Sequence, residues 1–282
     1  MPLPRTSDMN ERARPLAGLL AHGRTTVMGI LNVTPDSFSD GGQFFDPALA
    51  IEHARRMAAE GADILDIGAE STRPYGSMRP VTREDEIARL APVLPDVLRL
   101  GLPVSIDTIK AKVASFALDA GAAIVNDVWG LQRDPDMARV IAERGVPVIV
   151  MHNREVADAS VDIMADVKAF FSRSLDIAAR AGIARDRVVR DPGIGFGKTQ
   201  EQSITAIARF AEFRAFGQPL MMGLSRKRFI DKISPSQPSE RIGGSIAGNV
   251  LAVLAGADIV RVHDVAETVQ ALRVLDAIGK AR

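Results

Sequence analysis

Eight apolar runs of this 282-residue chain each end in polar residues whose types could do chemistry. The residues at these stops are Asn32, Asp66, Asp107, Asn126 with Asp127, His152 with Asn153, Asp191, Ser225 to Lys227, and His263 with Asp264. Carboxylates accept hydrogen bonds from N–H groups, and an asparagine amide both accepts and donates. Cationic groups such as Arg226, Lys227 and Arg261 bind anions. The set suits a heterocyclic substrate with several N–H donors that also carries a negatively charged group.

The apolar runs that precede these stops have the Val/Ile/Leu character of buried parallel strands. We expect strands at 25–31, 63–67, 103–106, 122–126, 146–151, 187–190, 219–224 and 258–262. Helices are expected between them, at 47–60, 82–100, 109–119, from 134 onward, and at 162–181, 200–213, 241–255 and 264–278. This order predicts an α/β fold, a single (β/α)8 TIM barrel, whose active site lies where the carboxyl ends of the strands meet.

The composition excludes several classes of function. The formal net charge is zero, which leaves no electrostatic basis for a nucleic-acid partner or a membrane surface. Cysteine is absent, which excludes disulfides, thiolate metal sites and a cysteine nucleophile. No apolar stretch is long enough to span a bilayer, and residues 1–22 lack the apolar core of a signal peptide. We expect a cytoplasmic protein with a flexible leader at 1–22 and one barrel domain at 23–282.

Two loops rich in glycine follow expected strands. The segment NVTPDSFSDGG (32–42) is longer than the usual connection of about 2–6 residues, so it is either a surface turn or a lid, and its place at the mouth favours a lid. The segment DPGIGFGKT (191–199) ends like a phosphate loop, but Pro192 stands where that loop requires glycine. We therefore reject that interpretation, and we expect these glycines to let the backbone approach a ligand while Asp191 points into the mouth.

Each polar residue at the mouth also has a plain structural alternative. Any one of the four strand-end residues Asp66, Asp107, Asn126 and Asp191 could be a structural ion-pair partner. Four in one mouth exceed what stability needs, because buried carboxylates are unfavourable unless they are paired. His263 could be a core histidine, although its position favours function. Arg228 is expected to lie in solvent, and His152 stays undecided.

Eight segments, taken in order, resemble the dihydropteroate synthase family of pterin-binding enzymes. They are GILNVTPDSFSDGG (29–42), DIGAESTRP (66–74), SIDT (105–108), IVNDVWG (124–130), VMHN (150–153), DPGIGFGKT (191–199), GLSRKRFI (223–230) and RVHDV (261–265). The resemblance implies a transferase of folate biosynthesis that joins 6-hydroxymethyl-7,8-dihydropterin pyrophosphate to p-aminobenzoate, with release of pyrophosphate. It also implies Mg2+ as cofactor, a homodimer, and sulfonamides as inhibitors.

The resemblance also assigns residues by position. It implies a pterin pocket of Asp66, Asp107, Asn126, Met151, Asp191 and Lys227. It implies a pyrophosphate site of Asn32, Thr72, Arg73, Arg261 and His263, with Asn32 also helping to hold Mg2+. The p-aminobenzoate site would be bordered by Pro35, Phe38, Thr72, Phe196, Ser225 and Arg226. The residues implied to act in catalysis are Asp107, Asp191, Lys227, Arg261 and His263.

The chemistry of the mouth fits such a reaction. Positive charge would build on the pterin methylene near the carboxylates, while Arg261, His263 and Mg2+ stabilise the departing pyrophosphate. The departures from the family are Ala69, where glycine is frequent, Arg228, where serine is common, and a longer second loop, STRPYGSMRPVT. Two alternatives stay open. A pterin-binding methyltransferase would not need the pyrophosphate residues, and a catalytically silent barrel would predict a broken first or second loop.

Overall fold

The computed structural model describes residues 18, 20, 23–34, 46–70 and 81–281, and in them eight parallel strands form a barrel. The strands are β1 (Thr26–Asn32), β2 (Ile64–Gly68), β3 (Val104–Asp107), β4 (Ile124–Asp127), β5 (Val148–Met151), β6 (Val188–Asp191), β7 (Met221–Met222) and β8 (Ile259–Val262). They pair in the order β6-β5-β4-β3-β2-β1-β8-β7, and a bridge between Arg190 and Leu220 joins β6 to β7 and closes the ring. The predicted (β/α)8 barrel is confirmed.

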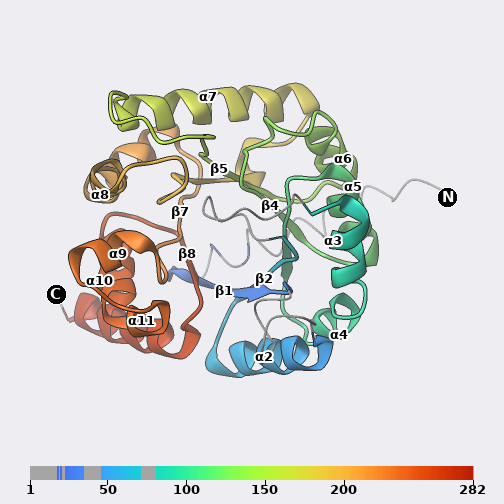
Figure 1. Ribbon diagram of the computed structural model, residues 1–282, viewed down its shortest axis with the longest axis horizontal. Coiled ribbons are helices and arrows are strands. Elements are labelled where there is room, and N and C mark those ends of the chain that lie inside the picture. Colours follow the sequence, from blue (N-terminus) through green and yellow to red (C-terminus); the bar gives the residue numbers. More distant parts are fainter. Residues whose placement is uncertain (1–17, 19, 21–22, 35–45, 71–80, 282) are drawn as a thin grey trace.

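Helices cover the outside of the strands (Figure 1). They are α2 (Pro47–Glu60), α3 (Arg83–Leu90), α4 (Leu94–Leu98), α5 (Ala111–Ala120), α6 (Met137–Arg144), α7 (Ile163–Ala181), α8 (Gln200–Ala208), α9 (Arg228–Ile233), α10 (Ile242–Leu254) and α11 (Val265–Lys280), with 3-10 turns η2 (Arg185–Arg187), η3 (Phe210–Phe216) and η4 (Pro238–Glu240). Aspartate side chains cap the start of two of them. Asp46 caps α2 by accepting from Ala48 N, and Asp162 caps α7 by accepting from Met164 N.

The interior of the barrel is built in layers that follow the two-residue period of the strands. One layer is an apolar cluster of Met28, Ile64, Ile124, Ile149, Val189, Met221 and Ile259. Two residues further along the same strands stand Ile30, Asp66, Asn126, Met151, Asp191, Gly223 and Arg261, and Asp107 takes the equivalent place on β3. Side chains two residues apart on a strand point to the same face of the sheet. The residues of this second layer therefore point into the barrel, as the apolar layer does, but they lie nearer the carboxyl ends of the strands, at the mouth.

Several element boundaries differ from those expected. The helix expected at 82–100 is two helices, α3 and α4, because Pro92 and Pro95 have no N–H to continue the hydrogen-bond ladder. Strand β7 is only Met221–Met222 rather than 219–224. Helix α6 begins at Met137, since the carboxylate of Asp134 instead accepts from the backbone of Asp136 and Ala111. The helix expected at 200–213 ends at Ala208, and α9 was not expected.

The leader expected at 1–22 lies almost entirely outside the described residues. Leu20, which is described, packs against the apolar layer of the barrel interior, so at this residue the segment contacts the barrel. The division into a leader and a barrel domain stays a prediction. Among the described residues, none of the helices combines the length and the hydropathy needed to span a membrane.

Candidate functional site

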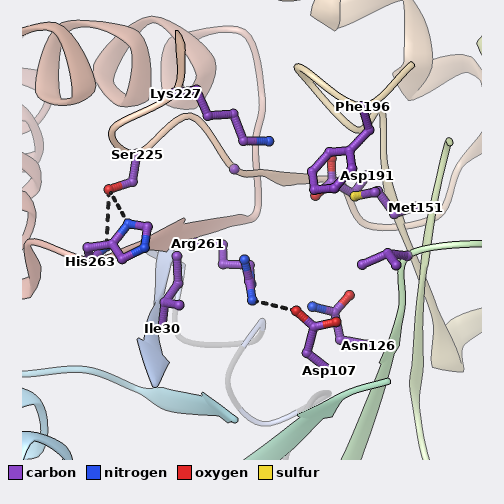
Figure 2. Close-up of a pocket in the computed structure, with 12 residues that line it drawn as sticks. Ile30, Asp107, Asn126, Met151, Asp191, Phe196, Ser225, Lys227, Arg261 and His263 are labelled. Atoms are coloured by element: carbon purple, nitrogen blue, oxygen red, sulfur yellow. Dashed lines mark hydrogen bonds and ion pairs between the residues drawn. The ribbon is translucent and has the colours of Figure 1, made fainter. Parts of the chain in front are cut away.

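A pocket opens at the carboxyl ends of the strands and collects most of the described site residues (Figure 2). Its lining residues are Ile30, Asp107, Asn126, Val128, Met151, Asp191, Phe196, Gly223, Ser225, Lys227, Arg261 and His263. They come from β1, β3 to β6 and β8 and from the loops that follow the strands. The pocket therefore unites the residues predicted for the pterin, except Asp66, with Arg261 and His263, which were predicted for the anion.

One end of the pocket is a cluster of buried carboxylates held by a single guanidinium. Arg261 donates from Nε to Asp66 Oδ2 at 2.6 Å and from Nη2 to Asp107 Oδ2 at 2.8 Å. Asn126 Nδ2 donates to the same oxygen of Asp66 at 3.1 Å. Three side-chain oxygens of this cluster (Asp66 Oδ1, Asp107 Oδ1 and Asn126 Oδ1) are buried and have no hydrogen-bond partner within the described part of the chain. Such acceptors are unfavourable unless a donor reaches them.

The carboxylate cluster shifts the titration of Asp107 into the neutral range. Burial raises the pKa of Asp107 to about 7, the guanidinium of Arg261 opposes this rise, and the carboxylate of Asp66 adds to it. The physical reason is that a single cation balances two carboxylates that are shielded from water, so a second negative charge there is unfavourable. A group with a pKa near neutral can hold or release a proton during a reaction, which fits Asp107 to acid–base work.

The opposite wall of the pocket carries Asp191, Lys227 and Phe196. Asp191 Oδ1 accepts from Gly193 N at 2.7 Å, and burial raises the pKa of Asp191 while Lys227 lowers it. Lys227 Nζ donates to the carbonyl of Ile194 and lies 4.7 Å from the centre of the Phe196 ring. Burial lowers the pKa of Lys227 to about 8, partly offset by Asp191. The ammonium and the carboxylate thus face the pocket as a pair of opposite charges without a direct ion pair.

Ser225 and His263 form a hydrogen-bonded pair at the rim between β7 and β8. Ser225 Oγ accepts from the backbone N of His263 at 3.1 Å and lies 3.0 Å from its Nδ1. The Ser225 hydroxyl can donate its proton to Nδ1 or accept a second bond from Nδ1–H, depending on the tautomer of the imidazole. The two contacts with Ser225 fix the position of the His263 ring at the rim of the pocket.

Arg226 is held at the surface of the same rim. It adopts a left-handed backbone conformation with a φ of 59°, which non-glycine residues rarely take. Its N–H donates to Ser245 Oγ at 2.9 Å, its carbonyl accepts from Arg241, and its guanidinium pairs with Asp264. Strain of this kind is retained where surrounding contacts over-determine it. The contacts with Ser245 and Arg241 thus tie the loop after β7 to α10.

Two glycines of the DPGIGFGKT loop pack closely against a neighbouring backbone segment. A Cβ atom at Gly193 would lie 1.9 Å from the carbonyl oxygen of His152, and one at Gly197 would lie 2.4 Å from that of Arg154. Both positions have positive φ. These two glycines therefore allow the loop to pack against the backbone that follows β5. The expectation that the glycines also let the backbone approach a ligand stays a prediction.

Sequence reasoning left His152 undecided and gave Lys198 no function. Both are buried beside this loop and bonded to each other, with Lys198 Nζ 2.6 Å from His152 Nδ1. The GKT ending drew attention to Lys198 only as part of a rejected phosphate loop. Four further candidates (Pro35, Phe38, Thr72 and Arg73) lie outside the described residues, so their roles stay predictions. Arg228 is exposed, as expected.

No cluster of three or more Asp, Glu or His side chains that could hold a metal ion occurs within the described ranges. Asn32, the residue predicted to help hold Mg2+, ends β1 and is partly exposed. Gly29 on β1 pairs with Val262 on β8, so the next residue on each strand, Ile30 and His263, lies at the same level. Asn32 comes two residues after Ile30. One amide oxygen at this place fits Mg2+ only if substrate oxygens complete its coordination, which is the usual arrangement for this ion.

Comparison with known proteins places the chain in a family. It matches the model described as pterin binding enzyme over residues 28–263. It is 43% identical over 256 residues to the dihydropteroate synthase of Bacillus subtilis strain 168, covering 90% of this chain and 89% of that protein. The structure of the Clostridium difficile dihydropteroate synthase in the presence of pteroic acid superposes with a TM-score of 0.86 at 47% identity, covering 90% of this chain and 97% of the other.

A second structure agrees closely. The dihydropteroate synthase of Xanthomonas albilineans with 4-aminobenzoic acid has a TM-score of 0.86 at 43% identity, covering 91% of this chain and 93% of that one. Sequence and fold therefore match over nearly the full length of these proteins. The chain belongs to the pterin-binding enzyme family and, within it, to the dihydropteroate synthases, which are transferases.

Proposed function

We propose that the protein joins 6-hydroxymethyl-7,8-dihydropterin pyrophosphate to p-aminobenzoate, giving 7,8-dihydropteroate and pyrophosphate in folate biosynthesis. The observation that carries this proposal is the pair of buried oxygens, Asp107 Oδ1 and Asn126 Oδ1, that find no donor within the described chain yet belong to residues lining the pocket. A pterin has several N–H donors on one edge. Its binding would satisfy acceptors whose burial is otherwise unfavourable.

The remaining pocket residues would fix the orientation of the pterin ring. Met151 is 4% exposed and supplies an apolar surface for a flat heterocycle. Lys227 is a donor and Asp191 an acceptor on the wall opposite Asp107, so polar groups on both edges of the ring would find partners. Because Asp107 and Asp191 are both buried, their charges act through little screening and favour positive charge on the pterin methylene.

Departure of pyrophosphate requires stabilisation of negative charge at the rim of the pocket. His263, whose ring is held there by Ser225, and Arg261, two residues earlier on β8, would provide N–H donors to the anion. Mg2+ held by Asn32 and substrate oxygens would supply Lewis-acid stabilisation of the leaving group. This arrangement favours a dissociative substitution, in which the bond to pyrophosphate breaks ahead of attack by the amine.

The site for p-aminobenzoate would lie on the Phe196 side of the pocket, bordered by Ser225 and Arg226. Phe196 offers a ring face, and the cation of Lys227 stands 4.7 Å from that ring. The amine of p-aminobenzoate is nucleophilic enough once it is positioned, so the protein contributes geometry rather than covalent chemistry. Sulfonamides, which share the shape of p-aminobenzoate, are expected to compete for this site.

A coupled assay for pyrophosphate release tests the proposed reaction. Pyrophosphate should appear only when the pterin pyrophosphate, p-aminobenzoate and Mg2+ are all present, and 7,8-dihydropteroate should form in equal amount by chromatography. A sulfonamide added to the same assay should raise the apparent KM for p-aminobenzoate without changing the maximal rate. Failure to form product with both substrates at saturating Mg2+ would reject the proposal.

A homodimer and a cytoplasmic location complete the proposal. An exposed apolar surface on two packed helices supports the dimer: Leu251 and Leu254 on α10 are 60% and 65% exposed, and Val274 and Ile278 on α11 are 56% and 52% exposed. Apolar area of this kind marks association sites. Sedimentation equilibrium should give twice the chain mass of 30.2 kDa, and Leu251→Lys should shift the protein toward the monomer.

A further inference from the structure

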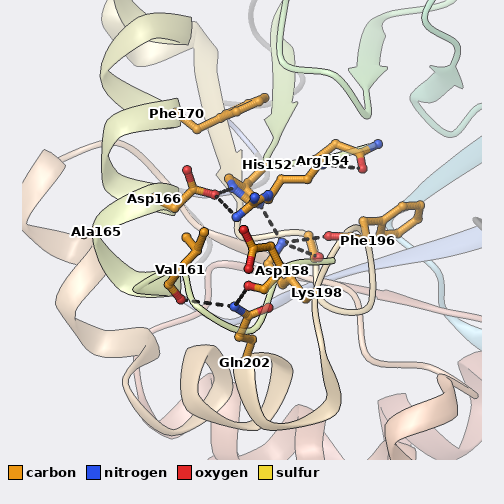
Figure 3. Close-up of polar contacts among 12 residues, drawn as sticks. His152, Arg154, Asp158, Val161, Ala165, Asp166, Phe170, Phe196, Lys198 and Gln202 are labelled. Carbon is orange, nitrogen blue, oxygen red and sulfur yellow. Dashed lines mark hydrogen bonds and ion pairs between the residues drawn. The ribbon is translucent and has the colours of Figure 1, made fainter. Parts of the chain in front are cut away.

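Behind the wall of the pocket lies a buried polar cluster that the proposed reaction does not use (Figure 3). Its centre is Lys198, which is 5% exposed, next to His152, which is fully buried. Lys198 Nζ lies 2.6 Å from His152 Nδ1, 2.8 Å from Gly193 O and 3.2 Å from Phe196 O. Lys198 belongs to the same 191–199 loop as Asp191 and Phe196. Asp191 and Phe196 line the pocket, whereas Lys198 is not among the lining residues.

The protons of this cluster follow from its geometry. His152 Nε2 lies 3.0 Å from Asp166 Oδ2, and Arg154 donates to the same oxygen at 3.3 Å, so this oxygen is an acceptor. The imidazole must then carry its proton on Nε2, and Nδ1 is an acceptor. Burial, together with the charges of Lys198 and Arg154, lowers the pKa of His152 to about 2, so this imidazole is neutral.

Lys198 therefore faces three acceptors, namely two backbone carbonyls and one imidazole nitrogen. An ammonium has three N–H donors and satisfies all three, whereas a neutral amine would turn its lone pair toward one of them. Burial lowers the pKa of Lys198 well below that of a free lysine, while the carboxylates of Asp191 and Asp166 act in the opposite direction. We assign the ammonium form, because leaving an acceptor opposed to a lone pair in a buried site is the costlier arrangement.

The contacts of Lys198 determine the conformation of the 193–197 loop beside the pocket. Gly193 O accepts from both Lys198 and Phe196 N, so the ammonium stabilises the tight turn at 193–196. The N–H of Gly193 in turn donates to Asp191 Oδ1, and the other end of the turn carries the Phe196 ring over Lys227. Close packing of Gly193 and Gly197 against the backbone of His152 and Arg154 leaves the loop no room to shift toward α7.

We propose that Lys198, with His152 as its acceptor, is a positioning residue that holds the 193–197 loop so that Asp191 and Phe196 face the substrates. This inference rests on the proposed function, since it assigns the loop to substrate binding. Lys198 touches no substrate and acts through the two carbonyls that it binds. The cluster of Asp166, His152 and Lys198 links α7 to the pocket and explains why a lysine is buried there.

Lys198→Met tests the inference, because methionine keeps the length of the side chain and removes all three donors. Lys112→Met, at an exposed position of α5, is the matched control. We expect Lys198→Met to raise the KM for p-aminobenzoate by roughly tenfold or more, with a smaller fall in kcat. Hydrogen exchange should accelerate at the amides of 193–198 and stay unchanged in the strands. Lys112→Met should match the wild type in both measurements.

Asp166→Ala is the second variant, and it keeps the proposal testable if Lys198→Met does not fold. Asp166 is partly exposed, so its loss should leave the barrel folded. The same change removes the acceptor that holds the imidazole proton of His152 on Nε2. The same local change in exchange and a smaller rise in KM are expected. Folded variants with wild-type KM and wild-type exchange in this loop would overturn the proposal, as would faster exchange spread over the whole barrel. A wild-type protein that forms no dihydropteroate would instead reject the proposed function and leave the exchange result standing.

Discussion

Arg261 on β8 reaches across the mouth of the barrel to Asp107 on β3, with its Nη2 2.8 Å from Asp107 Oδ2, although 154 residues separate the two along the chain. The same guanidinium binds Asp66 on β2 through Nε at 2.6 Å. The sequence placed Arg261 with the pyrophosphate. In the structure it is also the counter-charge of two buried carboxylates, so it connects the carboxylate end of the pocket to the rim where the anion is expected.

Removal of this counter-charge should destabilise the protein in a pH-dependent way. Arg261→Ala leaves Asp66 and Asp107 buried without a cation, a change that costs about 3–5 kcal/mol for a broken buried pair. Burial raises the pKa of Asp107 and Arg261 opposes this rise, so the folded variant must keep the Asp107 carboxyl protonated to a higher pH. In the unfolded chain Asp107 ionises near its ordinary pKa, so the loss grows as pH rises. Urea unfolding at pH 5 and pH 8 measures it. An equal loss at both values would show that the carboxylates are not responsible.

The proposed activity should depend on pH through Asp107 and Lys227. The pKa of Asp107 is raised to about 7, and its ionised form accepts from the pterin, so kcat/KM should rise as pH increases toward 7. The pKa of Lys227 is lowered to about 8, and its ammonium donates to the pterin, so kcat/KM should fall above pH 8. The profile should be a bell. Asp107→Asn should flatten the acid limb, and an unchanged limb in that variant would assign it to another group.

Asp191 should contribute strongly to turnover. Asp191→Ala removes a charge-assisted hydrogen bond to the ligand and leaves Lys227 without its nearest carboxylate. The expected loss is roughly 2–4 kcal/mol in transition-state stabilisation, or about 30- to 1000-fold in kcat/KM. The control is Asp176→Ala, at an exposed position on α7. Steady-state kinetics of Asp191→Ala that match the wild type would remove Asp191 from the site.

His263 should serve the anion rather than the pterin ring. His263→Ala is expected to weaken binding of pyrophosphate and of the pterin pyrophosphate by roughly tenfold or more, since a donor to a charged group is lost, while binding of a pterin without phosphates changes little. Titration calorimetry with the three ligands measures this. Arg228→Ala, which removes an exposed charge at the start of α9, should change none of them by more than about 1 kcal/mol. Equal losses for all ligands would point to a structural role of His263.

Asn32 is predicted to act through Mg2+. Chelation of Mg2+ should abolish pyrophosphate release, and Asn32→Ala should raise the Mg2+ concentration for half-maximal activity by roughly tenfold, because one of few protein oxygens on the ion is lost. Binding of a pterin without phosphates should be unaffected by either change. If Asn32→Ala has the Mg2+ dependence of the wild type, the ion is held elsewhere.

The sequence by itself determined the barrel and most of the residues at its mouth. Apolar runs mark buried strands, and the two-residue period of a strand puts Asp66 on the same side as Ile64, and Asp191 on the same side as Val189. Since all eight strands are parallel and their carboxyl ends meet, residues at those ends had to share one pocket. Local proline and capping chemistry set most helix boundaries, although Pro92 and Pro95 divided a helix that was expected to be continuous.

Only the tertiary structure decided which of these residues contact one another. The bonds from Arg261 to Asp66 and Asp107 depend on the register between strands and on closure of the ring, neither of which the periodicity of a single strand encodes. Likewise, the glycines of the 191–199 loop have the same signature whatever they pack against, and only the structure shows that Gly193 and Gly197 pack against the backbone of His152 and Arg154. That packing buried Lys198 against His152, a contact that follows from the meeting of β5 and β6 in space.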